Sequence, residues 1–284
     1  MPAFFNDRFV NDEEVLLHVS DLSMQRGYAV FDFFRSVNGR PLFTNDHLQR
    51  FFNSAKAMHL SVPYDAIQLS DIVIELLKKT SYPETGIRIM LTGGYSPNSY
   101  QLAAPNLIIT SIPLKTAGRE DFEKGMRVIS YEHQRELPHI KSINYQMAVW
   151  LQPLLNANKA DDVIYYKNGI VTEFPRSNIF MVSAEGKILT PANNVLHGIT
   201  RSKILELAKE IAETEEKDVS IGELMNAKEV FASSTTKRIL PVVTINGVSI
   251  GSGQAGPVTR LLYEKFLSLE NEHIKTNEQG VVIR

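Results

Sequence analysis

A polar stretch near the middle of the chain, LKTAGREDFEKG at residues 114–125, most constrains how this sequence can fold. It holds two glycines and separates two segments that each contain apolar strand-like runs and amphipathic helices. Stretches of this kind are typical of connections between domains. We therefore predict an N-terminal domain at residues 1–113, a linker at 114–125 and a C-terminal domain at 126–284.

The first segment combines a hairpin with two helices. FDFFRSVNGRPLF carries Asn38 and Gly39 between apolar runs, which is the strongest short hairpin signal. An amphipathic helix is predicted through DHLQRFFNSAKAM, capped by Asn45 or Asp46, and a second one through YDAIQLSDIVIELLKKT. GIRIMLTGGY and PNLIITSIPL read as further strands, so residues 1 to about 112 form an α+β unit.

The second segment is richer in strands. MRVISYEH and EVFASS read as strands, as do ILPVVTI and VSI with the turn Asn246-Gly247 between them, and a hairpin joins DVIYY to IVTEFPRSNIFMVS through the turn KNG. A helix near YQMAVWLQPLL is predicted to kink or stop at Pro153, and a closing helix carries Pro257 in its first turn. The fold class that follows is α+β with two domains and helices packed outside the second sheet.

Composition excludes several classes of function. The chain has no cysteine, which removes disulfides, thiol catalysis and cysteine-based zinc sites. Its seven histidines form no His-x-x-x-His pair, so we expect no metal site. A net charge of −2 argues against a nucleic-acid surface, and no apolar run approaches the roughly 18 residues of a membrane span. We therefore expect a cytoplasmic protein.

Two charged residues stand in unusual surroundings. Lys141, in HIKSINYQ, lies among apolar and uncharged polar residues, and it is either a solvated lysine or an amine tuned to attack a carbonyl. Glu173, in VTEFPRSNIF, lies inside an apolar strand, where a carboxylate is costly unless it is paired. The alternative for Glu173 is an edge strand with its carboxylate in water.

Three further features could bind an anion. HGITRSKILELAKE begins a strong helix, whose free N–H groups attract phosphate. A hydroxyl run from Ser233 to Thr236 follows a strand and is either a capped turn or a set of donors. Arg50 lies between apolar residues of its helix and either faces solvent or points partly inward. An amine, an acid and a phosphate cup together fit pyridoxal phosphate.

With these motifs in view, the sequence resembles the class IV pyridoxal-phosphate aminotransferases, a family that includes D-amino-acid and branched-chain aminotransferases and aminodeoxychorismate lyase. HLQRFFNSA resembles the family's phosphate-arginine helix and IKSINY its Schiff-base lysine motif. VTEFPRSNIF, LHGITR and SSTT followed by LPV are similar to its remaining three motifs, in the same order. The resemblance implies a homodimer with a smaller sandwich-like α/β domain and a larger strand-rich pseudo-barrel domain.

The resemblance also implies roles for single residues. Lys141 would form the Schiff base and move the substrate proton, Tyr145 would hydrogen-bond the cofactor's phenolic oxygen, and Glu173 would contact the ring nitrogen. The expected phosphate ligands are Arg50, Gly198, Ile199, Thr200, Ser234, Thr235 and Thr236. The implied reaction is ping-pong transfer of an amino group between an amino acid and a 2-oxo acid, and the alternative is a lyase of the aminodeoxychorismate type.

The substrate stays open at this point. The SSTT run favours the D-amino-acid branch, but SPNSYQ carries Asn98 and Tyr100 where that branch usually has Arg-x-His. The candidates for binding the substrate carboxylate are Arg26, Arg88, Arg176 and Lys237. Phe31, Phe33 and Tyr100 could line an apolar pocket, which keeps branched-chain substrates possible, although aromatic residues on strands are usually core residues.

Overall fold

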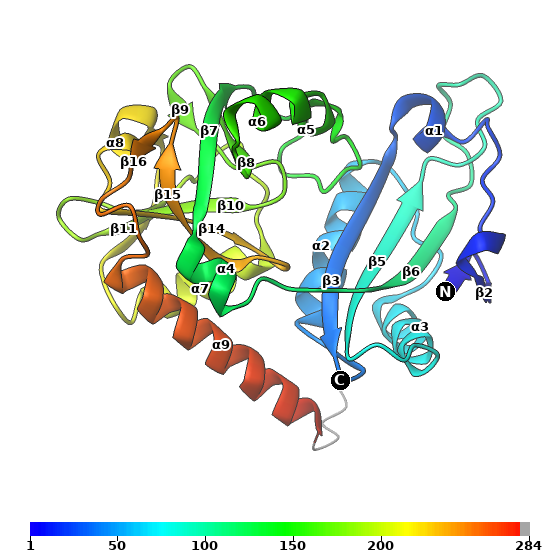
Figure 1. The fold of residues 1–284 in the computed structure, drawn as a ribbon. Coiled ribbons are helices and arrows are strands. Elements are labelled where there is room, and N and C mark those ends of the chain that lie inside the picture. The colour runs from blue at the N-terminus through cyan, green and yellow to red at the C-terminus, as the bar shows by residue number, and fades with distance from the viewer. Residues whose placement is uncertain (279–284) are drawn as a thin grey trace. The chain divides into compact units, whose positions relative to one another are not determined.

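The structure, a computed structural model, describes residues 1–278, and the chain divides into two compact units, each with its own β-sheet (Figure 1). Unit 1 contains residues Met1–Lys115, Ile140–Asn144 and the described residues from Glu270 onward. Unit 2 contains Thr116–His139 and Tyr145–Leu269. The α+β fold class predicted from the sequence is confirmed.

Unit 1 is built on a sheet with the order β2-β1-β6-β5-β3-β4. Its strands are β1 (Pro2–Phe5), β2 (Arg8–Asn11), β3 (Ala29–Val37), β4 (Arg40–Pro41), β5 (Glu84–Thr92) and β6 (Leu107–Pro113). Its helical segments are η1 (Asp12–Glu14), α1 (Leu22–Arg26), α2 (Thr44–Ala57) and α3 (Ala66–Lys78). The predicted hairpin joins β3 to β4, and Asn38 and Gly39 have the positive φ angles that its tight turn requires.

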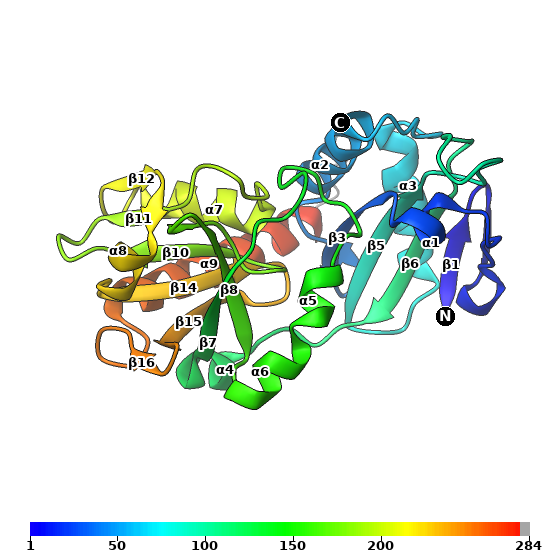
Figure 2. The same cartoon turned by 90° about the horizontal axis from the view of Figure 1, so that it is seen from above.

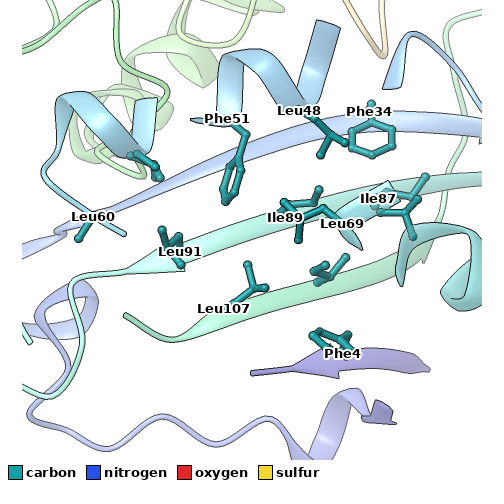
Figure 3. Close-up of a cluster of buried hydrophobic side chains, with 14 of the residues drawn as sticks. Phe4, Phe34, Leu48, Phe51, Leu60, Leu69, Ile87, Ile89, Leu91 and Leu107 are labelled. Carbon is teal, nitrogen blue, oxygen red and sulfur yellow. The ribbon is translucent and has the colours of Figure 1, made fainter. Parts of the chain in front are cut away.

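The core of unit 1 lies between α2, α3 and one face of this sheet. Leu48 and Phe51 of α2 and Leu69 of α3 pack on Ile87 and Ile89 of β5, as Figure 3 shows. The two helices cover the same side of the sheet in Figure 2 as well. Helix α2 begins at Thr44, so the prediction that Asn45 or Asp46 caps it is wrong. Burial of this face holds α2 at a fixed position on β3.

Residues 140–144 are held against β3 like a short additional strand. The amide of Phe31 donates to the carbonyl of Lys141 at 2.9 Å, and the amide of Ile143 donates to the carbonyl of Ala29 at 3.1 Å. Ile140 packs into the core of unit 1, and the amide of Lys141 donates to Ser54 Oγ on α2 at 3.2 Å. The backbone on both sides of Lys141 is therefore fixed by unit 1.

Unit 2 is built on a longer sheet with the order β12-β11-β10-β14-β15-β7-β8-β9-β13, with β16 paired to β15. Its strands are β7 (Met126–Glu132), β8 (Asp162–Lys167), β9 (Ile170–Val171), β10 (Asn178–Val182), β11 (Ile188–Thr190), β12 (Thr214–Glu216), β13 (Val219–Ser220), β14 (Glu229–Ser234), β15 (Arg238–Ile245) and β16 (Val248–Ser249). Asn-Gly turns join β8 to β9 and β15 to β16, as predicted.

The helices of unit 2 lie around its sheet and include α4 (Arg119–Lys124), α5 (Gln146–Trp150), α6 (Gln152–Asn158), α7 (Ile199–Ala208) and α8 (Ile221–Met225). The predicted break at Pro153 separates α5 from α6, and both helices lie beside β7 and β8 in Figures 1 and 2. Helix α4 falls inside the predicted linker, residues 114–125, and buries Phe122. Helix α9 (Pro257–Glu278) begins at Pro257, as predicted, and its residues divide between the two units.

Candidate functional site

In unit 1, Arg50 is held by a buried carboxylate. Its Nε donates to Asp32 Oδ2 and its Nη2 donates to Asp32 Oδ1, both at 2.8 Å. Asp32 lies on β3 and is 0% exposed, whereas 13% of the Arg50 side chain remains exposed. A two-pronged pair of this kind fixes the plane of a guanidinium group. Arg50 is therefore anchored on its helix with part of its charge facing outward.

His47 completes this buried cluster one turn earlier on α2. Its Nδ1–H donates to Asp32 Oδ1 at 2.7 Å. Burial lowers the pKa of His47, although the charge of Asp32 acts in the other direction. Burial alone would raise the pKa of Asp32, but Arg50 and His47 outweigh that effect and hold it well below its ordinary value. At neutral pH Asp32 is thus ionised and His47 is neutral.

Lys141 lies beside an aromatic ring of the same unit. Its Nζ is 4.6 Å from the centroid of the Phe31 ring, and the guanidinium of Arg88 is 5.2 Å from the same centroid. Phe31 lies on β3 next to Asp32, so the two side chains point to opposite faces of the strand. Arg88 lies on β5, paired with Phe33 and therefore diagonal to Phe31. Unit 1 thus brings an amine and a guanidinium group to one apolar ring.

In unit 2, Glu173 is a buried carboxylate with a donor at each oxygen. It is 4% exposed and follows β9 on the side of the hairpin that faces Tyr165. Arg135 Nε donates to Glu173 Oε1 at 2.8 Å, and the amide of Leu196 donates to Oε2 at 3.0 Å. The predicted need for a partner is met, and the alternative of an edge-strand glutamate in water is wrong because its side chain is buried.

The loop that holds Glu173 also leads into the predicted phosphate turn. Both backbone groups of Leu196 are hydrogen-bonded, since its amide donates to Glu173 and its carbonyl accepts from Asn178 Nδ2 at 2.7 Å. Two residues later Gly198 is the N-cap of α7, with no side-chain hydrogen bond capping that end in the described structure. A Cβ at Gly198 would collide with Asn178 Oδ1, so a larger residue here would have to displace the Asn178 side chain. Ile199 and Thr200 lie in the first turn of α7, and their backbone N–H groups are therefore suited to bind an anion.

The hydroxyl run lies at the end of β14, next to β10 and β15. Ser233 pairs with Asn178 across the strands, and its Oγ is buried without a hydrogen-bond partner among the described residues. Ser234 accepts a bond from the amide of Lys237 at 3.2 Å, and Thr235 and Thr236 are half-buried in the turn that follows β14. The structure thus places this run and the start of α7 at neighbouring positions around β10 and β14 within unit 2.

Tyr145 is the N-cap residue of α5 and is half-buried in unit 2. Its phenol group lies close enough to Tyr165 of β8 to affect the pKa of that residue. Burial raises the pKa of Tyr165, which therefore stays protonated at neutral pH. Tyr145 thus places a phenol group shortly after Lys141 in the sequence KSINY.

The four candidate carboxylate-binding cations differ in their surroundings. Arg26 lies over the ring of Tyr100, 4.8 Å from its centroid. Lys237 Nζ is committed to Asp162 at 2.5 Å and Ser177 at 3.1 Å. Arg176 is exposed. Only Arg88, among these four candidates in the described structure, shares its aromatic contact with Lys141.

The sequence reasoning missed the partners that hold the charged groups. Asp32 carried a usable signal, because an acid within the apolar run VFDFF is as unexpected as Glu173 in its strand. Arg135 and the amide of Leu196 carried none, since only the fold brings them to Glu173. Arg201, buried near the start of α7 and bonded to the carbonyl of Pro191 at 2.9 Å, was also missed.

Other kinds of site were searched in residues 1–278. No group of three or more histidine or acidic side chains in this range could hold a metal ion. No helix within the described chain is both long and apolar enough to cross a membrane.

The chain matches known proteins over most of its length. A family model described as amino-transferase class IV matches residues 29–245. D-alanine aminotransferase of Staphylococcus haemolyticus is 32% identical over 93% of this chain and 96% of that protein. A putative branched-chain-amino-acid aminotransferase of Methanocaldococcus jannaschii is 28% identical, with 96% and 97% covered.

Solved structures agree with the sequence relatives. Branched-chain amino acid aminotransferase of Escherichia coli has a TM-score of 0.88 at 27% identity, with 95% of this chain and 94% of that one covered. Branched-chain aminotransferase of the archaeon Thermoproteus uzoniensis, solved with norvaline, has a TM-score of 0.87 at 26% identity, with 96% and 95% covered. The family model spans well over half of this chain, and the five motifs found in the sequence fall within the matched range. The chain belongs to the amino-transferase class IV family.

Proposed function

We propose that this enzyme transfers the amino group of a D-amino acid to a 2-oxo acid, with Lys141 as its catalytic amine and Arg88 as the group that binds the substrate carboxylate. As a member of class IV it is a pyridoxal-phosphate-dependent aminotransferase that acts on an amino acid and a 2-oxo acid. The D-amino-acid preference and the residue roles are the new parts of this proposal. The residue roles rest on the two ion pairs, Arg50 with Asp32 and Arg135 with Glu173. The D-amino-acid preference rests on the SSTT run and on the similarity to D-alanine aminotransferase of Staphylococcus haemolyticus.

The residues present fit the cofactor. Ser233 Oγ is a buried hydroxyl without a partner in the described chain, and Gly198 leaves the start of α7 open to an anion. When bound, pyridoxal phosphate supplies an aldehyde that joins to amines and a ring that accepts the electrons of a breaking Cα–H bond. The residues that would hold its phosphate are Arg50, Gly198, Ile199, Thr200, Ser234, Thr235 and Thr236.

The proposed reaction gives separate roles to Lys141, Glu173 and Tyr145. Lys141 Nζ would take the proton from the substrate Cα and deliver it to the cofactor carbon C4′, which needs a neutral amine at a fixed place. The hydrogen bonds of residues 140–144 to β3 supply the fixed place. Glu173 would keep a proton on the ring nitrogen, and Tyr145 would donate to the phenolic oxygen.

Arg88 is the best-placed candidate for the substrate carboxylate. Its guanidinium group and Lys141 Nζ contact the same Phe31 ring, so a small substrate beside that ring could reach both. A guanidinium group binds a carboxylate through two parallel hydrogen bonds. Lys237 is a weaker candidate because Asp162 already neutralises it.

A substrate panel tests the reaction. The reconstituted enzyme should convert D-alanine and D-glutamate with pyruvate or 2-oxoglutarate as acceptor, and it should be slow with the L-isomers. Preference for L-leucine or L-valine would instead establish a branched-chain enzyme, and release of pyruvate from aminodeoxychorismate without an acceptor would establish a lyase. Arg88→Gln should raise KM at least about tenfold with a smaller change in kcat, whereas Arg26→Gln should not.

We also propose that two copies of the chain form the active enzyme. Apolar side chains are exposed around α1, including Leu16, Val19 and Met24, and Tyr100 is 80% exposed on the loop that the bridge from Asp21 to Tyr95 ties to this region. Sedimentation should give twice the chain mass, and Leu16→Glu should shift it toward a single chain. Ile67→Glu, at an equally exposed site on α3, should not. The cytoplasm stays the proposed location, and fractionation of cells tests it.

A further inference from the structure

Glu173 would be a costly residue in unit 2 without a fixed partner. A buried carboxylate loses its hydration and needs opposite charge and hydrogen bonds to stay ionised. Arg135 supplies the charge at Oε1, and the Leu196 amide supplies a second donor at Oε2. Each donor is itself fixed by another hydrogen bond. Because of this, the donors can orient the carboxylate of Glu173 as well as balance its charge.

Arg135 is fixed at its far end as well. Its Nη2 donates to the carbonyl of Pro138 at 2.7 Å, and 9% of its side chain is exposed. This bond closes a short loop between Arg135 and a residue three positions later. With Nε on the carboxylate and Nη2 on the backbone, the guanidinium plane cannot rotate away from Glu173.

The same arrangement limits how strongly Glu173 can hold a proton on a third group. A carboxylate that already accepts bonds from a guanidinium group and an amide is a weaker base than an isolated one. It can keep the ring nitrogen of the cofactor protonated without taking that proton for itself. The position of Glu173 is therefore set by Arg135 together with the Leu196 amide.

We infer that Arg135 is the positioning residue through which Glu173 meets the cofactor's ring nitrogen, an inference that rests on the proposed function of Glu173. Arg135 itself touches neither cofactor nor substrate in this scheme. Its effect should appear only for a ligand that has the ring nitrogen. A residue that only stabilised the fold would affect every cofactor analogue equally.

The experiment compares two ligands for the apoenzyme. Pyridoxal phosphate and its 1-deaza analogue, in which carbon replaces the ring nitrogen, are titrated by fluorescence, and the ratio of their Kd values is recorded. A hydrogen bond to a charged group should make the wild-type ratio about tenfold to hundredfold in favour of pyridoxal phosphate. Glu173→Gln should reduce that ratio, which checks the contact itself.

Arg135→Gln should bring the ratio below about threefold, and Arg135→Lys should restore part of it because it returns the charge without the fork. Arg127→Gln is the matched control, since Arg127 is an exposed arginine on β7. A wild-type ratio kept in full by Arg135→Gln would overturn the inference. If Arg135→Gln does not fold, as urea unfolding would show, the full ratio in Arg135→Lys would overturn it instead.

A third result separates this inference from the proposed function. If the wild-type enzyme binds both ligands equally, Glu173 does not contact the ring nitrogen, and the assigned role of Glu173 fails before Arg135 is considered. If the wild type prefers pyridoxal phosphate, Glu173→Gln loses that preference and the Arg135 variants keep it in full, the role of Glu173 stands and the role of Arg135 fails.

Discussion

Each unit fixes a charged side chain of the proposed site by an ion pair, but the fixed side chain is a cation in unit 1 and an anion in unit 2. In unit 1 a fully buried acid, Asp32, grips the cation Arg50 with both oxygens and leaves part of the guanidinium group exposed. In unit 2 the cation Arg135 donates to one oxygen of the more deeply buried anion Glu173, and a backbone amide donates to the other. One member of each pair fixes the orientation of the other. Under the proposed function, the cation would bind the phosphate and the anion would contact the ring nitrogen.

The largest effect is expected from the amine, which neither pair can replace. Lys141→Ala should lower kcat by at least about ten-thousandfold, because both the covalent attachment and the proton transfer use that nitrogen. The control is Lys56→Ala, an exposed lysine on α2 in the same unit. Steady-state rates decide the matter, and near-normal turnover by Lys141→Ala would remove the assignment.

Breaking the unit 1 pair should cost stability. Asp32→Asn leaves the charge of Arg50 without its buried counterion, so the free energy of unfolding should fall by about 3–5 kcal/mol. Asp71→Asn, an exposed acid on α3, should change it by less than about 0.5 kcal/mol. Urea unfolding measures both. An equally small loss for Asp32→Asn would mean that the pair contributes little to folding.

The phosphate turn of unit 2 can be disturbed through its glycine. Gly198→Ala places a methyl group against Asn178 and should displace the side chain that holds the carbonyl of Leu196. We expect the Kd for pyridoxal phosphate to rise about tenfold, equivalent to roughly 1.4 kcal/mol. Gly222→Ala in α8 has space for the methyl group and should leave the Kd unchanged. Unchanged binding by Gly198→Ala would show that the turn adapts.

The smallest effect is a difference in pH dependence between the units. Burial lowers the pKa of His47 in unit 1 and, together with Arg135, that of His133 in unit 2. In the unfolded chain these histidines bind protons at a higher pH than in the native chain. Their contribution to the free energy of unfolding is therefore fully present above about pH 6.5 and is lost as the pH falls below it. From about pH 7.5 to about pH 5.5, His47 should account for about 1 kcal/mol of that loss.

Urea unfolding across this pH range separates the two histidines. His47→Gln should flatten the slope more than His133→Gln, because His47 is the more deeply buried ring. Asp32, whose pKa is held below its ordinary value, contributes stability that is lost only at lower pH, as the pH falls through that depressed pKa. An equal or larger effect of His133→Gln would reverse the ranking of the two units.

The sequence predicted the local elements well where a few adjacent residues determine them. The Asn-Gly turns at residues 38, 168 and 246 were found because a positive φ angle at both positions selects those residues. The start of α2 was misplaced because Phe43 takes a left-handed conformation that no sequence rule assigns to phenylalanine. The family motifs gave the proposed cofactor residues, but they gave no sign of Asp32 or Arg135, whose contacts join segments far apart in the chain.

The placing of Lys141 has a consequence for the order of folding. Its segment is fixed by hydrogen bonds to Ala29 and Phe31, which leave the ribosome long before it does. Contacts between such distant positions form late, since a long loop must close first. A nascent chain that has completed its first hairpin therefore has no fixed position for Lys141 until residues 140–144 have docked on β3.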